Sequence, residues 1–186
     1  MDLRARLAAG CVMAVVAGTA CAAPDACFEA SARRYQLDAR LLKAMARVES
    51  GMNPAAVNLT HRDRTKTVDI GLLQINSGWL PTLARYGIGE RELKDACTNI
   101  EVGAWILAGA VARHGNQWQA VGAYNAACTQ LKGDACTAQR ASYAWKVYRH
   151  MDRATAGARA PNSAVVTRSA RIEASPLQVI SVGRSS

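Results

Sequence analysis

Most apolar residues of the chain recur at the spacing of an α-helix. The clearest case predicts a helix from about residue 39 to residue 50, capped at its start by Asp38. Its apolar stripe consists of Leu41, Leu42, Met45 and Val48. Gly51 and the pair Asn53-Pro54 should end it, because these residues favour turns over a further helical turn. Glu49 therefore lies at the edge of the buried face, in the last turn.

Further helices are predicted on both sides of this one. We expect them over residues 27–35, 98–114, 117–127 and 139–154. Gly115 should close the second, which is apolar enough to be largely buried. The last should be amphipathic, with one apolar side formed by Tyr143, Val147, Tyr148 and Met151.

The stretch between residues 51 and 98 is less regular. Residues 58–67 are polar and basic without periodicity, which indicates a loop or a small hairpin. A short apolar element follows at 70–76, then a turn and a short helix at 77–88. The chain is therefore predicted to be mostly α, as one domain over residues 24–153 with a minor irregular or β part.

The two ends of the chain differ from this domain in composition. Residues 1–22 have a basic start, an apolar run and a small-residue end, which together are typical of a secretory signal peptide. The apolar run is too short to span a membrane, so no stable membrane insertion is expected. A lipid anchor at Cys11 or Cys21 is the less favoured alternative. Residues 154–186 are small, polar and basic, and are interpreted as a flexible tail.

Export changes how the cysteines are interpreted. Removal of the signal peptide leaves four of the six, namely Cys27, Cys97, Cys128 and Cys136. An even number in an oxidising compartment predicts two disulfides. We favour Cys128–Cys136, which are close in sequence, with Cys27–Cys97, although three pairings are open. A zinc site is the alternative, but neither C-x-x-C nor H-x-x-x-H spacing occurs, so no metal is expected.

The net charge of +9 favours an anionic partner such as nucleic acid, a membrane surface or the cell wall. Export makes nucleic acid the least favoured of these, and no nucleic-acid-binding motif is present. Four Trp and five Tyr against one Phe suit a carbohydrate-binding surface, although the same rings could simply be core residues.

Two carboxylates stand out as candidates for chemistry. Glycosidic cleavage needs a proton donor with a raised pKa and a group that stabilises positive charge on the sugar. Glu49, at the edge of an apolar face, is placed to be desolvated. Asp69 could supply the negative charge if the intervening loop folds back. Either residue alone is more commonly a solvated charge. No role is assigned to His61 or His114.

Four stretches together resemble the motifs of lytic transglycosylases. They occur in the family's order as "ESGMNPAAVN" (49–58), "GLLQIN" (71–76), "NIEVGAWIL" (99–107) and "AVGAYNAA" (120–127). The wider pattern is most similar to the small members that accompany type III and type IV secretion systems and pilus assembly. The resemblance implies a lysozyme-like fold, a peptidoglycan glycan strand as substrate and no cofactor.

The same resemblance implies roles for individual residues. Glu49 matches the family's acid and base, and Ser50 the neighbour that orients it. Gln74, Asn76 and Asn99 match cleft-lining positions, and Tyr124 the tyrosine that faces the glutamate. Asn125 completes that fourth motif and joins the substrate-binding set. The three amides could instead cap backbone groups and form turns, and Tyr124 could be an ordinary core aromatic.

Two positions depart from the family pattern. Asp69 stands where many relatives have a small residue, and "VDIGLLQINSGWL" (68–80) also resembles the segment of animal-type lysozymes that carries their second carboxylate. Ala127 replaces a frequent glycine.

The expected reaction cuts the bond between N-acetylmuramic acid and N-acetylglucosamine with a 1,6-anhydro product. The expected setting is the periplasm, with a monomeric enzyme that opens the wall locally for a secretion or pilus apparatus. Lysozyme-type hydrolysis and a non-catalytic wall-binding scaffold remain as alternatives.

Overall fold

A computed structural model describes residues 24–126, 128 and 132–155. The predicted signal peptide, Ala127 and the chain beyond Thr155 lie outside the described residues. The principal helices are α1 (Pro24–Tyr35), α2 (Ala39–Ser50), α5 (Ala96–His114), α6 (Gln117–Asn125) and α7 (Gly133–Thr155). Two short helices, α3 (Arg62–Thr65) and α4 (Leu80–Leu83), and three 3₁₀ turns lie between α2 and α5.

A small antiparallel sheet supplies the minor β part. Its strands are β1 (Val57–Asn58), β2 (Asp69–Ile70) and β3 (Ile75–Asn76), in that order. Asp69 pairs with Asn58 on one side and with Asn76 on the other. The prediction of a mostly α fold with a minor β part is confirmed, and residues 58–67 form a hairpin connection that contains α3.

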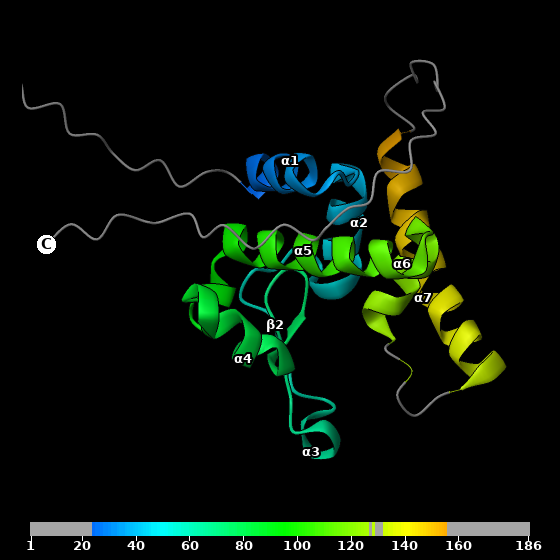
Figure 1. The fold of residues 1–186 in the computed structure, drawn as a ribbon. Helices are drawn as coiled ribbons and strands as arrows, with labels where there is room; N and C mark the ends of the chain where they lie inside the picture. Colours follow the sequence, from blue (N-terminus) through cyan, green and yellow to red (C-terminus); the bar gives the residue numbers. More distant parts are fainter. Residues whose placement is uncertain (1–23, 127, 129–131, 156–186) are drawn as a thin grey trace, which may run out of the picture.

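Helix α5 lies at the centre of the arrangement (Figure 1). It packs against α1 and α6, while α2 packs against α7. The sheet and α4 lie on the other side of α5 from α1, and α3 projects beyond them (Figure 1). The core between these elements includes the fully buried side chains Phe28, Leu41, Leu42, Met45, Ile70, Leu73, Ile100 and Leu107.

The ends of the main helices follow the sequence signals. Asp38 caps α2 by accepting a hydrogen bond from the Arg40 amide. Gly51 ends α2 in the left-handed conformation, with φ of 63°, which costs glycine little. Gly115 ends α5 in the same way, as predicted. These stops set where the last turn of α2, and with it Glu49, can lie.

The prediction for the last helix is correct only in part. Tyr143 and Val147 are buried, but Tyr148 is 39% exposed and does not share their side. Five residues advance a helix by about 500°, so Tyr148 is turned well away from Tyr143.

Both favoured disulfides are present. Cys27–Cys97 joins α1 to α5, and Cys128–Cys136 joins the segment after α6 to the start of α7. The α1–α5 contact is reinforced at Glu101, whose carboxylate accepts hydrogen bonds from the side chains of Ser31, Arg34 and Tyr35. Within the described ranges, no helix is long and apolar enough to cross a membrane.

Candidate active site

Glu49 lies in the last turn of α2 and contacts α7. The Tyr143 hydroxyl donates a hydrogen bond to its carboxylate. Burial raises the pKa of Glu49 from 4.5 to about 7, the Tyr143 hydrogen bond opposes this rise, and the negative charge of Asp69 adds to it. A carboxyl whose pKa is raised towards neutrality can hold its proton there and can act both as acid and as base.

Asp69 lies at the start of β2, close enough for its charge to act on Glu49. Its carboxylate is surrounded by donors. Asn76 Nδ2 donates to Oδ1 at 2.8 Å, while His61 Nε2 and Asn58 Nδ2 lie 2.7 Å and 3.3 Å from Oδ2. The fold therefore brings together the two carboxylates that the sequence singled out, from α2 and from the sheet.

Ser50 connects these two parts of the site. Its hydroxyl lies 2.8 Å from the carbonyl oxygen of Leu72 and 3.1 Å from that of Ala46, and accepts a hydrogen bond from the Asn53 amide. These contacts tie the end of α2 to the loop between β2 and β3. Glu49, the residue before Ser50, belongs to the helix end that these contacts hold.

Asn99 is buried, with 1% of its surface exposed. Its amide donates to the carbonyl oxygens of Ile70 and Leu93 and accepts from the Leu73 amide. Gly71, with φ of 78°, passes so close that an added Cβ would lie 2.2 Å from Asn99 Nδ2. The expectation that Asn99 lines a cleft is therefore wrong, because burial and these three bonds occupy it. Asn99 holds the β2–β3 loop in place, which agrees with the alternative that the amide caps backbone groups.

Gln74 and Asn76 also make local contacts. Gln74 Nε2 donates to the carbonyl oxygens of Gly71 and Ala56 and so stabilises a turn at a residue with φ of 46°. Asn76 caps the following 3₁₀ turn, η1 (Ser77–Trp79), through Gly78 and donates to Asp69. Both are only partly buried, so turn formation accounts for their contacts and leaves them accessible.

The tyrosine in contact with Glu49 is Tyr143, which sequence reasoning missed. Tyr124 instead donates to the carbonyl oxygen of Leu73 at 2.9 Å. Burial first, and then the charges of Glu49 and Asp69, raise the pKa of Tyr124 well above 10.0. Tyr124 therefore still lies near both carboxylates. One signal in the sequence could have pointed to Tyr143, since a buried tyrosine hydroxyl in an apolar stripe generally needs a polar partner.

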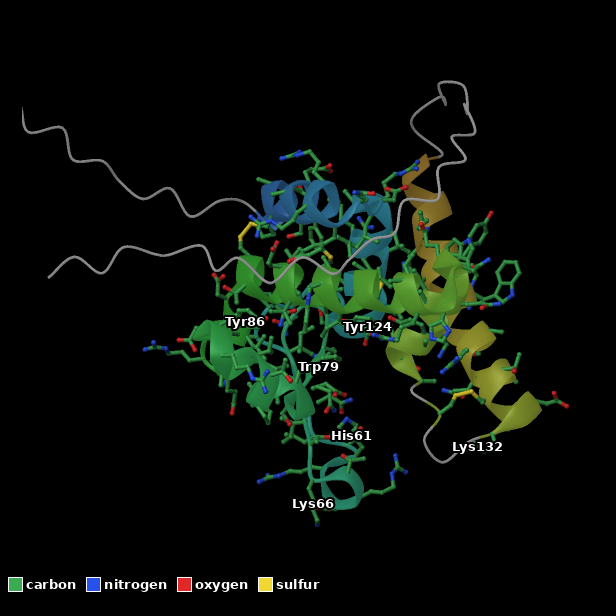
Figure 2. All side chains as sticks on the ribbon, in the orientation of Figure 1. His61, Lys66, Trp79, Tyr86, Tyr124 and Lys132 are labelled. Carbon is green, nitrogen blue, oxygen red and sulfur yellow. A yellow bond between two sulfur atoms is a disulfide. The ribbon has the colours of Figure 1, made fainter. Side chains whose placement is uncertain are left out.

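Four further observations delimit the site. Asn125, at the end of α6, is exposed. No cluster of ligands fit for a metal ion occurs among the described residues. A pocket of about 590 Å³ lies between α6 and α7, but neither Glu49 nor Asp69 lines it. His61, which touches Asp69, lies on the projecting hairpin that has Lys66 near its tip (Figure 2).

Comparison with known proteins places the chain in a family. Residues 26–144 match the model of the transglycosylase SLT domain. The chain is 35% identical over 126 residues to Invasion protein IagB of Salmonella typhimurium, covering 67% of this chain and 76% of that protein. It is 38% identical over 130 residues to the X polypeptide of Escherichia coli, covering 69% and 73%. It is 33% identical over 137 residues to Protein IpgF of Shigella flexneri, covering 73% and 86%.

The match runs from within α1 to within α7 and includes both carboxylates, so it covers most of the described fold. Enzymes of this family act on peptidoglycan, which implies an extracytoplasmic site of action. By this match, and by relatives at this level of identity, the chain belongs to the SLT-type lytic transglycosylases.

Proposed function

We propose that the chain cleaves the β-1,4 bond between N-acetylmuramic acid and N-acetylglucosamine and leaves a 1,6-anhydromuramoyl end. The observation that carries this proposal is the setting of Glu49, whose carboxylate lies against the buried hydroxyl of Tyr143 at the end of α2. Burial there raises its pKa to about 7, and the charge of Asp69 adds to the rise. A glycosidic oxygen needs a proton before it can leave, and only a carboxyl with a raised pKa is still protonated near neutral pH.

The proposed reaction has two steps at Glu49. The protonated carboxyl gives its proton to the bridging oxygen, and the bond from that oxygen to the muramoyl C1 breaks. The carboxylate then takes the proton of the muramoyl C6 hydroxyl, whose oxygen forms the new bond to C1. Glu49 ends protonated as it began, no water is consumed, and no metal or cofactor takes part.

Asp69 and the neighbouring polar groups support these steps. The proposed role of Asp69 is to stabilise positive charge on the sugar while C1 lacks its leaving oxygen. Tyr143 holds the Glu49 carboxylate, and Ser50 holds the end of α2. We assign substrate contact to Gln74, Asn76 and Asn125, which stay accessible, and to the ring of Tyr124, which is only partly buried.

The decisive experiment treats purified peptidoglycan with the protein and with the Glu49→Gln variant. We expect the wild type to release muropeptides with anhydro ends, which are lighter than hydrolysed ends by one water. The variant keeps the size of the side chain but cannot give a proton, so we expect a loss of about 10²- to 10⁴-fold in rate. A matched control is Glu90→Gln, whose carboxylate pairs with Lys94 on the surface.

Other results would contradict specific parts of the proposal. Full activity of Glu49→Gln would remove Glu49 from the mechanism. Products with ordinary reducing ends would show water as the nucleophile, as in lysozymes, a possibility that the presence of Asp69 favours. An inactive wild type that still binds peptidoglycan would indicate a wall-binding scaffold.

The setting of this reaction is also a proposal. We infer a periplasmic enzyme, exported by residues 1–22, that opens the wall locally for a secretion or pilus apparatus and acts as a monomer. The positive net charge and a relative named as an invasion protein support this setting. Fractionation of cells that express the tagged full chain tests the location, and a cytoplasmic protein of unprocessed mass would contradict it.

A further inference from the structure

The Asp69 carboxylate belongs to a closed ring of hydrogen bonds formed by five side chains. The contacts run from Asp69 to His61 at 2.7 Å, from His61 Nδ1 to Thr65 at 3.0 Å and from Thr65 to Thr67 at 2.9 Å. Asn76 Nδ2 closes the ring, at 3.0 Å from the Thr67 hydroxyl and 2.8 Å from Asp69. The ring links the projecting hairpin to the carboxylate that faces the site.

The chemistry of these side chains fixes the direction of the hydrogen bond between His61 and Asp69. An ionised carboxylate can only accept hydrogen bonds, so Nε2 of His61 must carry a proton and donate it to Asp69. In the neutral imidazole Nδ1 is then an acceptor, and the Thr65 hydroxyl, which also lies 3.0 Å from the His61 carbonyl oxygen, is the donor within reach. Both nitrogens of the imidazole therefore lie within hydrogen-bond distance of a side chain, which limits the orientation of its plane.

The hairpin contributes little else that would fix Asp69. Helix α3 is a single turn without buried residues, and His61 stands at its start without capping it. The side chains of His61 and Asp69 are each 19% exposed, so water competes only partly for the bond between them. Loss of the imidazole would leave Asn58 Nδ2, at 3.3 Å, as the remaining contact to Oδ2 among those described.

We propose that His61 is a positioning residue for Asp69: its Nε2–H holds the carboxylate in the orientation that stabilises positive charge on the sugar. This inference rests on the proposed function, because the role of Asp69 does. His61 itself touches neither the sugar nor Glu49 in this scheme. It acts through Asp69, and every effect of its removal on the rate should pass through that residue.

Two substitutions of His61 separate the effect of its Nε2–H donor from that of the imidazole as a whole. The amide nitrogen of glutamine reaches about as far from the backbone as Nε2, whereas that of asparagine reaches only as far as Nδ1. We therefore expect His61→Asn and His61→Ala to lower kcat about tenfold with little change in KM, and His61→Gln to retain most of the rate. Equal rates for the Gln and Asn variants would overturn the proposal.

A double-mutant cycle tests the route of the effect. If His61 acts through Asp69, His61→Ala should lower kcat in the wild type but not in the Asp69→Asn background. Losses that multiply in the double variant would overturn the proposal, since they would show a separate structural effect. His114→Gln, at the far end of α5, is the matched control and should retain full activity.

One measurement does not depend on activity. Nitrogen-15 NMR of the His61 ring in the wild type, above about pH 8 where an ordinary imidazole is neutral, should show the proton on Nε2. A proton on Nδ1 would overturn the proposal even if every variant failed to fold. An inactive wild type that shows the Nε2–H form would instead contradict the proposed function and leave the contact to Asp69 in place.

Discussion

Glu49 and Asp69 carry the same functional group, but the protein surrounds them differently. Glu49 ends a helix whose inner face is core, and the hydroxyl of Tyr143 contacts its carboxylate. Asp69 begins a two-residue strand, and His61, Asn58 and Asn76 contact its carboxylate. Burial favours the protonated form of the first, whereas hydrogen-bond donors surround the second.

The two environments also differ in what supports them. Tyr143 comes from α7, so the environment of Glu49 depends on the packing of α2 against a helix almost a hundred residues away. The donors to Asp69 come from residues within eleven positions of it. The environment of Glu49 is therefore set by tertiary packing, and that of Asp69 by the small sheet and its connections. Lysozyme shows the same division between two carboxyl groups with different roles.

The largest effect that we expect from breaking this comparison is a fall in the rate of the Asp69→Asn variant. The variant keeps the shape of the side chain but removes the negative charge, so we expect kcat to fall roughly 10- to 100-fold with folding intact. Because the charge of Asp69 raises the pKa of Glu49, the alkaline limb of the pH–rate profile should move to lower pH. The rate and the profile on purified peptidoglycan measure both effects, and an unchanged rate would make Asp69 structural.

A smaller effect is expected on stability, from Glu49→Gln. The unfolded chain loses the Glu49 proton near pH 4.5 and the folded chain only near 7. The ionised form therefore costs stability, and this cost grows as pH rises between the two values. The variant should gain about 1 to 3 kcal/mol in the free energy of unfolding above about pH 8, and nothing below about pH 4. Urea unfolding at both pH values measures it, and a gain that is the same at both would contradict the pKa.

The smallest effect compares the two tyrosines. The hydrogen bond from Tyr143 lowers the pKa of Glu49, so Tyr143→Phe should shift the alkaline limb to higher pH and change the rate only about two- to fivefold. Tyr124→Phe is the matched control, because that hydroxyl binds Leu73 and should leave the limb in place. Equal shifts in the two variants would mean that the contact between Tyr143 and Glu49 does not set the pKa.

The two environments were not equally predictable from sequence. The α2 segment carries its own signals, with Asp38 at its start, Gly51 at its end and an apolar stripe between them, so the place of Glu49 followed from local rules. The contact that surrounds the Glu49 carboxylate did not follow from local rules. Tyr143 lies in an apolar stripe that describes a core aromatic equally well, and only the packing of α7 on α2 shows which it is.

The hairpin shows the opposite failure. Residues 58–67 have no periodicity, so the sequence predicted a loop or a small hairpin there but none of its contacts. The bond of His61 to Asp69 depends on the register of β1 and β2, which two-residue strands do not encode in their pattern. Asn99 was misjudged for a related reason, because an asparagine at the start of a buried helix can face a cleft or a loop with the same sequence around it.

The disulfides divide the chain in a way that affects how the protein must be produced. Cys27–Cys97, with a sequence separation of 70, encloses both carboxylates and the whole sheet, whereas Cys128–Cys136 spans only 8. On a chain-entropy basis, closing the long loop destabilises the unfolded state by about 4 kcal/mol and the short one by about 2.5 kcal/mol. Expression in a reducing cytoplasm would therefore give a chain whose α2 and hairpin unfold more readily, and low activity of such a preparation would report on oxidation rather than on catalysis.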